Sequence, residues 1–345
     1  MSLRLLPTSE ARAGRAALLA RLAACGRFGF GASALGNLYR EVSEAEARAA
    51  IDTAWAEGIR YFDTAPFYGA GLSERRLGDA LRERNPDDYV LSTKAGRLLF
   101  PAAARDRDGF HSPMPFSPVF DYSYDGVMRS FEASLHRLGL ARIDILYLHD
   151  LGSATHGANH RYMFQQAVDG GFRALTALRE QGAVSAIGLG VNEVEICAES
   201  MAHADFDLFL IAGRFTLLDQ SAASFFDTCH QRGIGVVAAG VFSSGILAAG
   251  AAGPDAFHDY GPASEAIRKQ VAAIERICGT FEVPLPAIAL QFAAAHPAVT
   301  IPIVGVRHAA QVEAAIDFSR FPLPAELWKA LRSEGLIAPE TSTNA

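Results

Sequence analysis

The sequence predicts an α/β fold, a single (β/α)8 barrel whose loops on one face are unusually long. Short apolar segments alternate eight times with longer amphipathic segments, and the apolar segments lack the polar–apolar alternation of half-exposed strands. Eight such units in roughly 300 residues match the size of one barrel. Half of the 345 residues are hydrophobic, which is enough for one large core.

The expected elements follow one another as strand and helix. Strands are expected at residues 27–32, 59–63, 88–94, 143–149, 184–191, 206–213, 234–240 and 299–305. Helices are expected to follow them at residues 42–58, 73–84, 125–139, 173–182, 193–204, 221–233, 286–296 and 308–319. The first helix has clear boundaries, because Ser43 and Glu46 have capping-box spacing and Gly58 ends the segment.

A doubly wound sheet is the rival fold. The segment GFGASALG at residues 29–36 contains Gly29, Gly31 and Ala34, which fit the phosphate-loop pattern G-x-G-x-x-A. The preceding LAACGR is a poor strand, and no clean helix begins at the third position of the pattern. The barrel is therefore favoured over this alternative.

We expect one domain with short extensions. Residues 1–26 are expected to form a leader or a short amphipathic helix, residues 27–335 the barrel, and residues 336–345 a C-terminal tail. Arginines interrupt every apolar run that could serve as a secretory segment: Arg12, Arg15, Arg21 and Arg27. No stretch of about 18 apolar residues occurs, so we expect no membrane span.

Two segments are longer than ordinary strand-to-helix connections. Residues 97–124 contain four prolines and several aromatic residues, and residues 242–263 are rich in Gly, Ala and Ser before turning polar. Long loops in compact domains usually act as lids or insertions. Both follow strands at the face where we expect catalysis.

The overall composition narrows the class of protein. The net charge is −7 with mixed signs, and no basic patch with interleaved aromatics occurs, so nucleic acid is not an expected partner. Four cysteines, Cys25, Cys197, Cys229 and Cys278, are far apart and form no C-x-x-C pair. We interpret them as reduced, mostly buried thiols of a cytoplasmic protein.

Four polar residues coincide with the C-terminal ends of expected strands, where barrels carry their catalytic groups. Asp63 ends the second strand, Tyr68 lies in the loop behind it, Lys94 ends the third strand, and His149 ends the fourth. Each has an ordinary structural explanation when taken alone, such as a turn cap or a rim aromatic. The hypothesis of a catalytic site rests on all four meeting at adjacent strand ends.

The four side chains form a coherent chemical set. A tyrosine has an ordinary pKa of about 10 and is a poor acid or base at neutral pH. A nearby lysine stabilises the phenolate and lowers that pKa, and a carboxylate keeps the lysine charged and oriented. A reduction of about two to three units would require about 3–4 kcal/mol of differential stabilisation. A histidine beside them can polarise a carbonyl or hydroxyl group.

Other motifs are weaker. His156 and His160 have the i,i+4 spacing of zinc ligands, but Gly157 stands where H-E-x-x-H has its glutamate, so we expect no metal site. The sequence contains neither G-x-S-x-G nor a Walker A motif.

Several longer motifs resemble the aldo-keto reductase superfamily from about residue 28 to about residue 319. They are YFDTAPFYGAGLSERRLGDAL, VLSTKAGRLL, RSFEASLHRLGLARIDILYLHD and IGLGVNE. The segments GNLYR, FDYSYDGVMRS and AGRFTLLDQ resemble the branch that contains D-threo-aldose (L-fucose) 1-dehydrogenases, pyridoxal 4-dehydrogenases and L-galactose dehydrogenases. The resemblance implies a catalytic tetrad of Asp63, Tyr68, Lys94 and His149, in which Asp63 holds Lys94 and Lys94 tunes Tyr68.

The resemblance also implies a nicotinamide cofactor lying extended over the barrel mouth. Asn192 matches the residue that binds the nicotinamide amide. The loop AAGVFSSGIL matches the segment over the pyrophosphate, with candidate residues Gly240, Phe242, Ser243, Ser244, Gly245 and Leu247. The usual stacking aromatic and the amide-binding glutamine of the family would fall near Ala239 and Ala212, so Phe242 is considered as the stacking surface.

The adenosine end of the cofactor site is implied at residues 301–315, with Gly305, Arg307 and Gln311. NADP-dependent members of the superfamily clamp the 2′-phosphate with a lysine and an arginine, and these positions are Gly305 and Gln311 here. A dianionic phosphate needs charge-assisted partners. Arg307 lies close enough in sequence to replace the clamp in part. We therefore expect NAD to be preferred, with NADP possible.

The expected activity is oxidation of the C1 hydroxyl of an aldose hemiacetal, of the L-fucose, D-arabinose or L-galactose type, to a lactone. The alternatives are pyridoxal oxidation and general aldehyde reduction. A non-catalytic, cofactor-sensing subunit is a hypothesis of a different class. The expected partner is a small molecule, and the protein is expected to be a monomer or a homodimer.

Overall fold

The strands form one closed ring, which confirms the predicted barrel. The computed structural model describes residues 8–253 and 256–338. Neighbouring strands pair in parallel around the ring in the order β1, β12, β9, β8, β7, β6, β3, β2. Their bounds are β1 (Gly29–Gly31), β2 (Tyr61–Asp63), β3 (Val90–Ala95), β6 (Ile145–His149), β7 (Ala186–Val191), β8 (Leu208–Ala212), β9 (Gly235–Ala239) and β12 (Val299–Gly305). A closed parallel ring excludes the doubly wound alternative.

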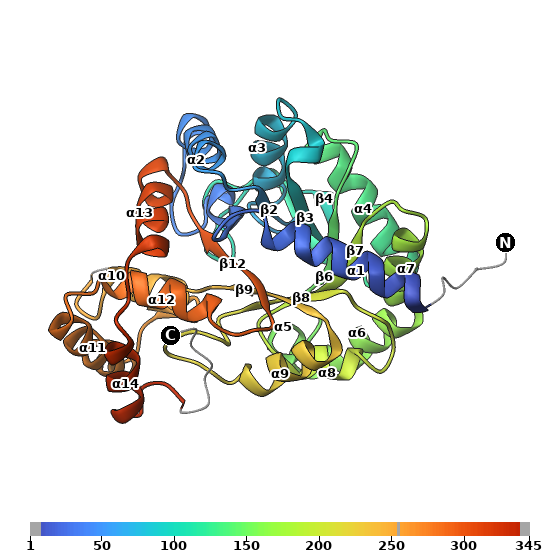
Figure 1. Ribbon diagram of the computed structural model, residues 1–345. Coiled ribbons are helices and arrows are strands. Elements are labelled where there is room, and N and C mark those ends of the chain that lie inside the picture. The colour runs from blue at the N-terminus through green and yellow to red at the C-terminus, as the bar shows by residue number, and fades with distance from the viewer. Residues whose placement is uncertain (1–7, 254–255, 339–345) are drawn as a thin grey trace.

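Helices surround this ring, as Figure 1 shows. Those at the predicted positions are α2 (Glu44–Ala56), α3 (Leu72–Leu81), α4 (Tyr124–Leu138), α7 (Phe172–Glu180), α8 (Glu195–Ser200), α9 (Ala223–Arg232), α12 (Leu285–Ala294) and α13 (Ala309–Arg320). The predicted capping box is present at α2, where Ser43 Oγ accepts from the Glu46 N–H at 3.2 Å and Glu46 Oε2 accepts from the Ser43 N–H at 2.8 Å.

Several elements were not foreseen from the sequence. The first long loop folds into an antiparallel hairpin, β4 (Arg97–Pro101) and β5 (Phe116–Phe120). The second contains a short ribbon, β10 (Phe257–His258) and β11 (Gly261–Pro262). The additional helices are α5 (Ser153–His156), α6 (His160–Gln166), α10 (Ile246–Ala249), α11 (Glu265–Thr280) and α14 (Ala325–Ser333). The prolines of this segment spoke against strands, because proline cannot donate a hydrogen bond to a neighbouring strand. Both strands of a two-stranded ribbon have a free edge, where proline is tolerated.

A helix before the first strand closes the N-terminal end of the barrel. This helix, α1 (Thr8–Ala23), lies across the strand ring in Figure 1. Leu18 and Leu22 are buried in one cluster with strand residues such as Val90 and Ile145, which begin β3 and β6. Because these contacts are with the starts of strands, α1 covers the face opposite the predicted catalytic face.

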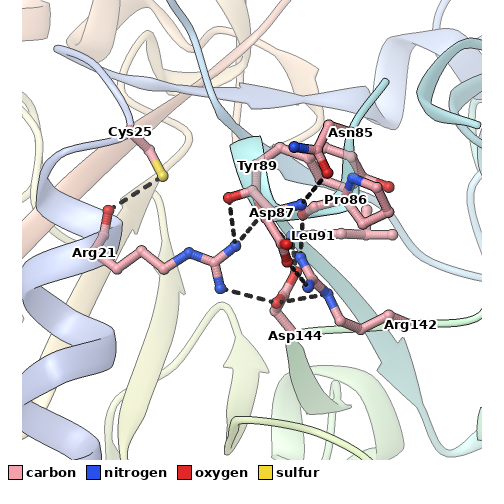
Figure 2. Close-up of polar contacts among 9 residues, drawn as sticks. All are labelled: Arg21, Cys25, Asn85, Pro86, Asp87, Tyr89, Leu91, Arg142 and Asp144. Carbon is pink, nitrogen blue, oxygen red and sulfur yellow. Dashed lines mark hydrogen bonds and ion pairs between the residues drawn. The ribbon is translucent and has the colours of Figure 1, made fainter. Parts of the chain in front are cut away.

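Arginines fasten α1 to the barrel. Arg21 contacts Asp144, the residue before β6, at 3.3 Å, and Figure 2 shows Arg21 and Arg142 approaching this carboxylate from opposite sides. Arg15 contacts Asp207, the residue before β8, at 3.2 Å. From residue 8 onward, the segment expected to be a leader or a short helix therefore contributes to the packed structure.

The four cysteines are free and buried, as expected from the sequence. Burial raises the pKa of Cys25 to about 11 and that of Cys229 to about 12, which keeps both thiols protonated at neutral pH. Across residues 8–253 and 256–338, no single helix has the length and apolar composition of a membrane span. Only α11 and α12 taken together pass that test, and they are bent by 102° at their junction.

Candidate active site

Three neighbouring strands bring the predicted catalytic residues to one rim of the barrel. Asp63 is the last residue of β2, Lys94 lies near the end of β3, and His149 is the last residue of β6. β3 pairs with β2 on one side and with β6 on the other, all in parallel. Parallel strands end at the same edge, so the three side chains share the C-terminal face.

Lys94 and Asp63 form a buried ion pair. The ammonium Nζ lies 2.7 Å from Asp63 Oδ2 and 2.9 Å from the carbonyl oxygen of Thr64, and Lys94 is 1% exposed. Ser92 donates from Oγ to Asp63 Oδ1 at 2.6 Å. A Cβ on Gly190 would lie 3.2 Å from Lys94 Cε, so the neighbouring strand leaves room for the lysine chain by carrying no side chain there.

Tyr68 reaches the same place from the loop after β2. A Cβ on Gly36 would lie 2.7 Å from the nitrogen of Gly69, so the loops after β1 and β2 can touch only because both residues are glycines. This contact places the Tyr68 ring 4.8 Å from Lys94 Nζ and 6.0 Å from the ring of His149. The glycine that follows Tyr68 in the sequence therefore serves to position it.

The pKa shifts of Tyr68 and Lys94 agree only in part with the expectation from sequence. Burial raises the pKa of Tyr68, and the positive charge of Lys94 lowers it again without restoring the ordinary value. Lys94 therefore lowers the pKa of Tyr68 as expected, but burial raises it by more, so the expected net reduction is wrong. Burial works against the charge of Lys94, but Asp63 and Tyr68 outweigh it and raise the pKa of the lysine. The ammonium thus stays charged beneath the phenol.

His149 is held neutral. Burial, followed by the positive charges of Arg97 and Lys94, lowers the pKa of His149 well below its ordinary value. Its Nε2 lies 3.5 Å from Asp150 Oδ2, whereas within the described part of the chain Nδ1 has no hydrogen-bond partner. The hydroxyl of Tyr122 lies 2.7 Å from the carbonyl oxygen of His149 and fixes the backbone there.

Sequence reasoning missed several of these neighbours. Ser92 lies two residues before Lys94, on the same face of β3, so strand alternation could have identified it. Arg97 forms an ion pair with Asp150 and lies 3.8 Å above the ring of Phe67. No local signal marks Arg97, because its partner is brought near by the barrel.

The residues predicted to hold the nicotinamide amide and the pyrophosphate of a cofactor lie along the same rim. Asn192 directly follows β7 and is partly exposed. Ser243 and Ser244 have left-handed backbones, with φ of 48° and 59°. The N–H groups of Ser243 and Gly245 already donate to the carbonyl oxygens of Gly240 and Phe242, at 2.8 and 2.9 Å. The buried hydroxyl of Ser243 donates to Thr216 Oγ1 at 3.1 Å, so the hydroxyl of Ser244 is the best placed of these groups to serve as a donor for a ligand.

Two of the predicted cofactor residues, Phe242 and Leu247, pack into the hydrophobic core to different extents. Phe242 is partly buried and packs against the hydrophobic core. Leu247 is fully buried in that core, and its N–H donates to the carbonyl oxygen of Phe242 at 3.2 Å. Neither the side chain nor the amide of Leu247 is thus available at the rim.

At the other end of the predicted cofactor site, Gly305 ends β12 and is exposed. The side-chain oxygen of Gln311 accepts from the Arg307 N–H at 3.0 Å, so Gln311 stabilises the turn after the strand. Arg307 supplies the positive charge in this segment.

The two histidines with zinc-like spacing have other contacts. His156 Nε2 lies 2.9 Å from the hydroxyl of Tyr122, and its ring packs edge-on against Phe120 at 4.4 Å. His160 Nδ1 lies 2.9 Å from the carbonyl oxygen of Gly157.

The sequence profile described as the aldo/keto reductase family matches residues 27–334, which is nearly the whole chain. The chain belongs to this family. Aldo-keto reductases are oxidoreductases that use nicotinamide cofactors, and the chain has the closed parallel barrel of the family with the four predicted catalytic side chains at its C-terminal face.

Curated relatives act on aldoses and on pyridoxal. The chain is 45% identical to a pyridoxal 4-dehydrogenase of Microbacterium luteolum and 40% identical to a D-threo-aldose 1-dehydrogenase of a Pseudomonas species. Both alignments cover 90% of this chain and 94% of the relative. An L-galactose dehydrogenase of Arabidopsis thaliana is 28% identical over 83% of this chain and 81% of its own length. These findings agree with the branch expected from the sequence motifs.

Solved structures of aldo-keto reductases share the fold. A glycerol dehydrogenase from Gluconobacter oxydans has a TM-score of 0.70 at 21% identity, covering 90% of this chain and 91% of its own. The cofactor-bound form of an aldo-keto reductase from Bacillus halodurans has a TM-score of 0.68 at 24% identity, covering 89% and 91%. At these identities the likeness concerns the barrel alone.

Proposed function

We propose that this aldo-keto reductase oxidises the C1 hydroxyl of a cyclic hemiacetal to a lactone, with Tyr68 as the acid/base. The observation that carries the proposal is the buried Lys94–Asp63 pair beneath the Tyr68 ring, beside a neutral His149. A charged lysine that is held within reach of a phenol can stabilise the phenolate form. These four side chains are sufficient for the acid/base step.

Each side chain has one task in the proposed reaction. Tyr68 accepts the proton of the C1 hydroxyl, and Lys94 stabilises the negative charge that the phenol oxygen carries before this transfer. His149 is neutral and can donate one hydrogen bond, so it orients the C1 oxygen without adding charge to the site. Asp63 keeps Lys94 in place and charged. The chemistry that a bound, oxidised nicotinamide would supply is acceptance of a hydride from C1.

The residues along the rim fit a nicotinamide dinucleotide. Asn192 offers an amide to the carboxamide group at the reactive end. The hydroxyl of Ser244 accepts from the backbone N–H of Tyr260 at 3.0 Å and interacts with the side chain of Tyr39, which a phosphate could replace as its hydrogen-bond acceptor. Arg307 carries a positive charge at the end of β12, where the adenosine half would lie. These three positions span the reactive group, the phosphates and the nucleoside.

The proposed substrate is an aldose of the L-fucose, D-arabinose or L-galactose type. The 40% identity to a D-threo-aldose 1-dehydrogenase over nearly the whole chain supports it. Pyridoxal is the second candidate, favoured by the 45% identity to a pyridoxal 4-dehydrogenase and by its ability to form the same kind of cyclic hemiacetal. General aldehyde reduction remains a further alternative.

A grid of substrates and cofactors tests the proposal. Purified protein is mixed with NAD or NADP and with each aldose, pyridoxal or a simple aldehyde, and absorbance of the reduced nicotinamide is followed. We expect an aldose to give the highest kcat/KM. Turnover of pyridoxal alone would move the assignment to the second candidate, and cofactor binding without turnover of any substrate would favour a non-catalytic subunit.

A further inference from the structure

The short ribbon in the second long loop has an unusual turn. β10 and β11 pair antiparallel, with Phe257 opposite Pro262 and His258 opposite Gly261, so Asp259 and Tyr260 alone connect them. Both connecting residues have positive φ, 49° for Asp259 and 66° for Tyr260. Two-residue turns of this kind favour Asn-Gly, and a left-handed backbone is unfavourable for a bulky aromatic residue. Strain of this type persists only where surrounding contacts hold it, and it clusters at active sites and ligand clamps.

The ribbon is fixed to the loops of three other strands. The ring of Phe257 stacks on Tyr39, in the loop after β1, with centroids 5.4 Å apart and planes 15° apart. Asp259 pairs with Arg214, after β8, at 2.5 Å. The Tyr260 N–H donates to Ser244, after β9, at 3.0 Å. These contacts hold the turn over the barrel mouth rather than away from it.

The side chain of Tyr260 reaches the predicted catalytic and cofactor residues. Its hydroxyl interacts with the side chain of Asn192, and it is close enough to Tyr68 that a negative charge on Tyr68 would disfavour ionisation of Tyr260. Burial of the hydroxyl, followed by the effect of Tyr68, raises the pKa of Tyr260. The residue nevertheless keeps 56% of its surface exposed. Because the neighbours of the hydroxyl line the mouth, this end of the side chain lies beside the site where ligands would bind.

The residues at the ends of β8 and β9 are too small to cover a bound ring, so this role falls to a loop residue. β8 and β9 end in Ala212 and Ala239, which lie opposite each other in the barrel register, and a methyl group cannot cover a bound ring. We infer that Tyr260 is a further positioning residue of the active site, whose ring covers the bound nicotinamide and whose hydroxyl occupies Asn192 until the carboxamide replaces it. The inference rests on the proposed function for the placement of nicotinamide at Asn192.

Two substitutions separate the ring from the hydroxyl. Tyr260→Phe keeps the cover and frees Asn192, so NADH is expected to bind as tightly as to the wild type or up to several-fold more tightly. Tyr260→Ala removes the cover and is expected to weaken NADH binding by about tenfold, the effect of losing one aromatic contact. A purely structural role for the residue would change both variants in the same direction.

The measurement is the dissociation constant of NADH, obtained from the fluorescence of the bound nicotinamide without any substrate. Tyr162→Ala is the matched control, because Tyr162 is 69% exposed on α6 and should leave binding unchanged. Tyr260→Gly checks for unfolding: glycine relieves the left-handed strain, so the variant should melt no earlier than the wild type while binding NADH as weakly as Tyr260→Ala.

Equal NADH affinity in Tyr260→Ala and the wild type would overturn the inference, as would weaker binding in Tyr260→Phe that matches the loss in Tyr260→Ala. The test does not depend on turnover. A wild-type protein that binds NADH but oxidises no substrate would contradict the proposed function, while the comparison of dissociation constants would still decide the role of Tyr260.

Discussion

Both ends of the barrel bury carboxylates beside cations, but the two ends use them differently. At the N-terminal end Asp144 accepts from the Leu91 N–H at 2.8 Å and contacts Arg21 and Arg142 at 3.3 and 3.1 Å. At the C-terminal end Asp63 contacts a single lysine. The difference lies in how completely the hydrogen-bonding groups around each carboxylate are satisfied.

The N-terminal arrangement occurs twice. Asp207 accepts from the Ile187 N–H at 3.0 Å and contacts Arg15 and Arg179 at 3.2 and 2.8 Å. Like Asp144, it directly precedes a strand, takes its N–H from the second residue of a neighbouring strand, and receives one arginine from α1. Two arginines and an amide leave each carboxylate fully paired, which is what a buried charge requires for stability.

At the C-terminal end, some buried hydrogen-bonding groups have no partner among the described residues. Lys94 donates to Asp63 and to the Thr64 carbonyl and also interacts with Tyr68, the residue proposed to exchange a proton with the substrate. Among the described residues, His149 Nδ1 and Arg97 Nε are buried without a hydrogen-bond partner. Unpaired buried groups cost free energy, so they are expected where a ligand or a reaction uses them. Pairing that is complete stabilises the fold, whereas pairing that is incomplete supports chemistry.

The largest expected effect is the loss of catalysis in Tyr68→Phe. The substitution removes the proton acceptor and keeps the ring contacts, so kcat should fall by about 10²–10⁴-fold while the melting temperature stays unchanged. Steady-state kinetics with the best substrate provide the measurement, and Tyr162→Phe on the exposed surface is the control. A kcat within twofold of the wild type would refute the assignment of Tyr68.

At the N-terminal end of the barrel, we expect a substitution to lower the free energy of unfolding and to leave kcat unchanged. Asp207→Ala leaves the buried Arg15 and the partly buried Arg179 without their shared carboxylate and should lower the free energy of unfolding by about 3–5 kcal/mol. Asp205 is the matched control, because it also pairs with Arg15, at 2.6 Å, but is 61% exposed. Asp205→Ala should cost about 1 kcal/mol or less. Urea unfolding measures both.

For both variants kcat below the melting transition should equal the wild-type value. A drop in kcat that accompanies the instability of Asp207→Ala would mean that the two ends are coupled, contrary to the comparison.

The next largest expected effect is the dependence of kcat/KM for oxidation on pH. Burial raises the pKa of Tyr68 above its ordinary value, so the reactive phenolate is scarce at neutral pH and its fraction grows as pH rises. We expect kcat/KM for oxidation to rise about tenfold per pH unit between roughly pH 7 and pH 9. His149 is neutral throughout this range and should add no step. A plateau that begins below pH 8 would contradict the raised pKa.

The smallest expected effect concerns the choice of cofactor. Gly305 and Gln311 offer no charge to a 2′-phosphate, and one arginine, Arg307, makes a weaker clamp than a pair of cations. NAD should therefore exceed NADP in kcat/KM by about tenfold, the equivalent of one lost charged hydrogen bond. The same assay with both cofactors provides the measurement. Equal values, or an NADP preference that disappears in Arg307→Ala, would identify Arg307 as a sufficient clamp.

The sequence by itself determined the barrel and the positions of the four predicted catalytic residues. Apolar segments without alternation indicate strands buried on both faces, and amphipathic segments between them indicate covering helices. Strand-end positions for Asp63, Lys94 and His149 follow from those segments, because parallel strands of a closed sheet end at one rim. These inferences depend on local pattern and topology alone.

Only the tertiary structure decided the surroundings of those residues. The pairing of α1 with Asp144 and Asp207 joins segments more than 100 residues apart, and no local pattern encodes such a contact. The direction of the pKa change at Tyr68 depends on the balance between burial and Lys94, which a sequence does not contain. The hairpin in residues 97–124 and the turn that carries Tyr260 were likewise hidden, because prolines and a strained backbone contradict the propensities from which strands and turns are predicted.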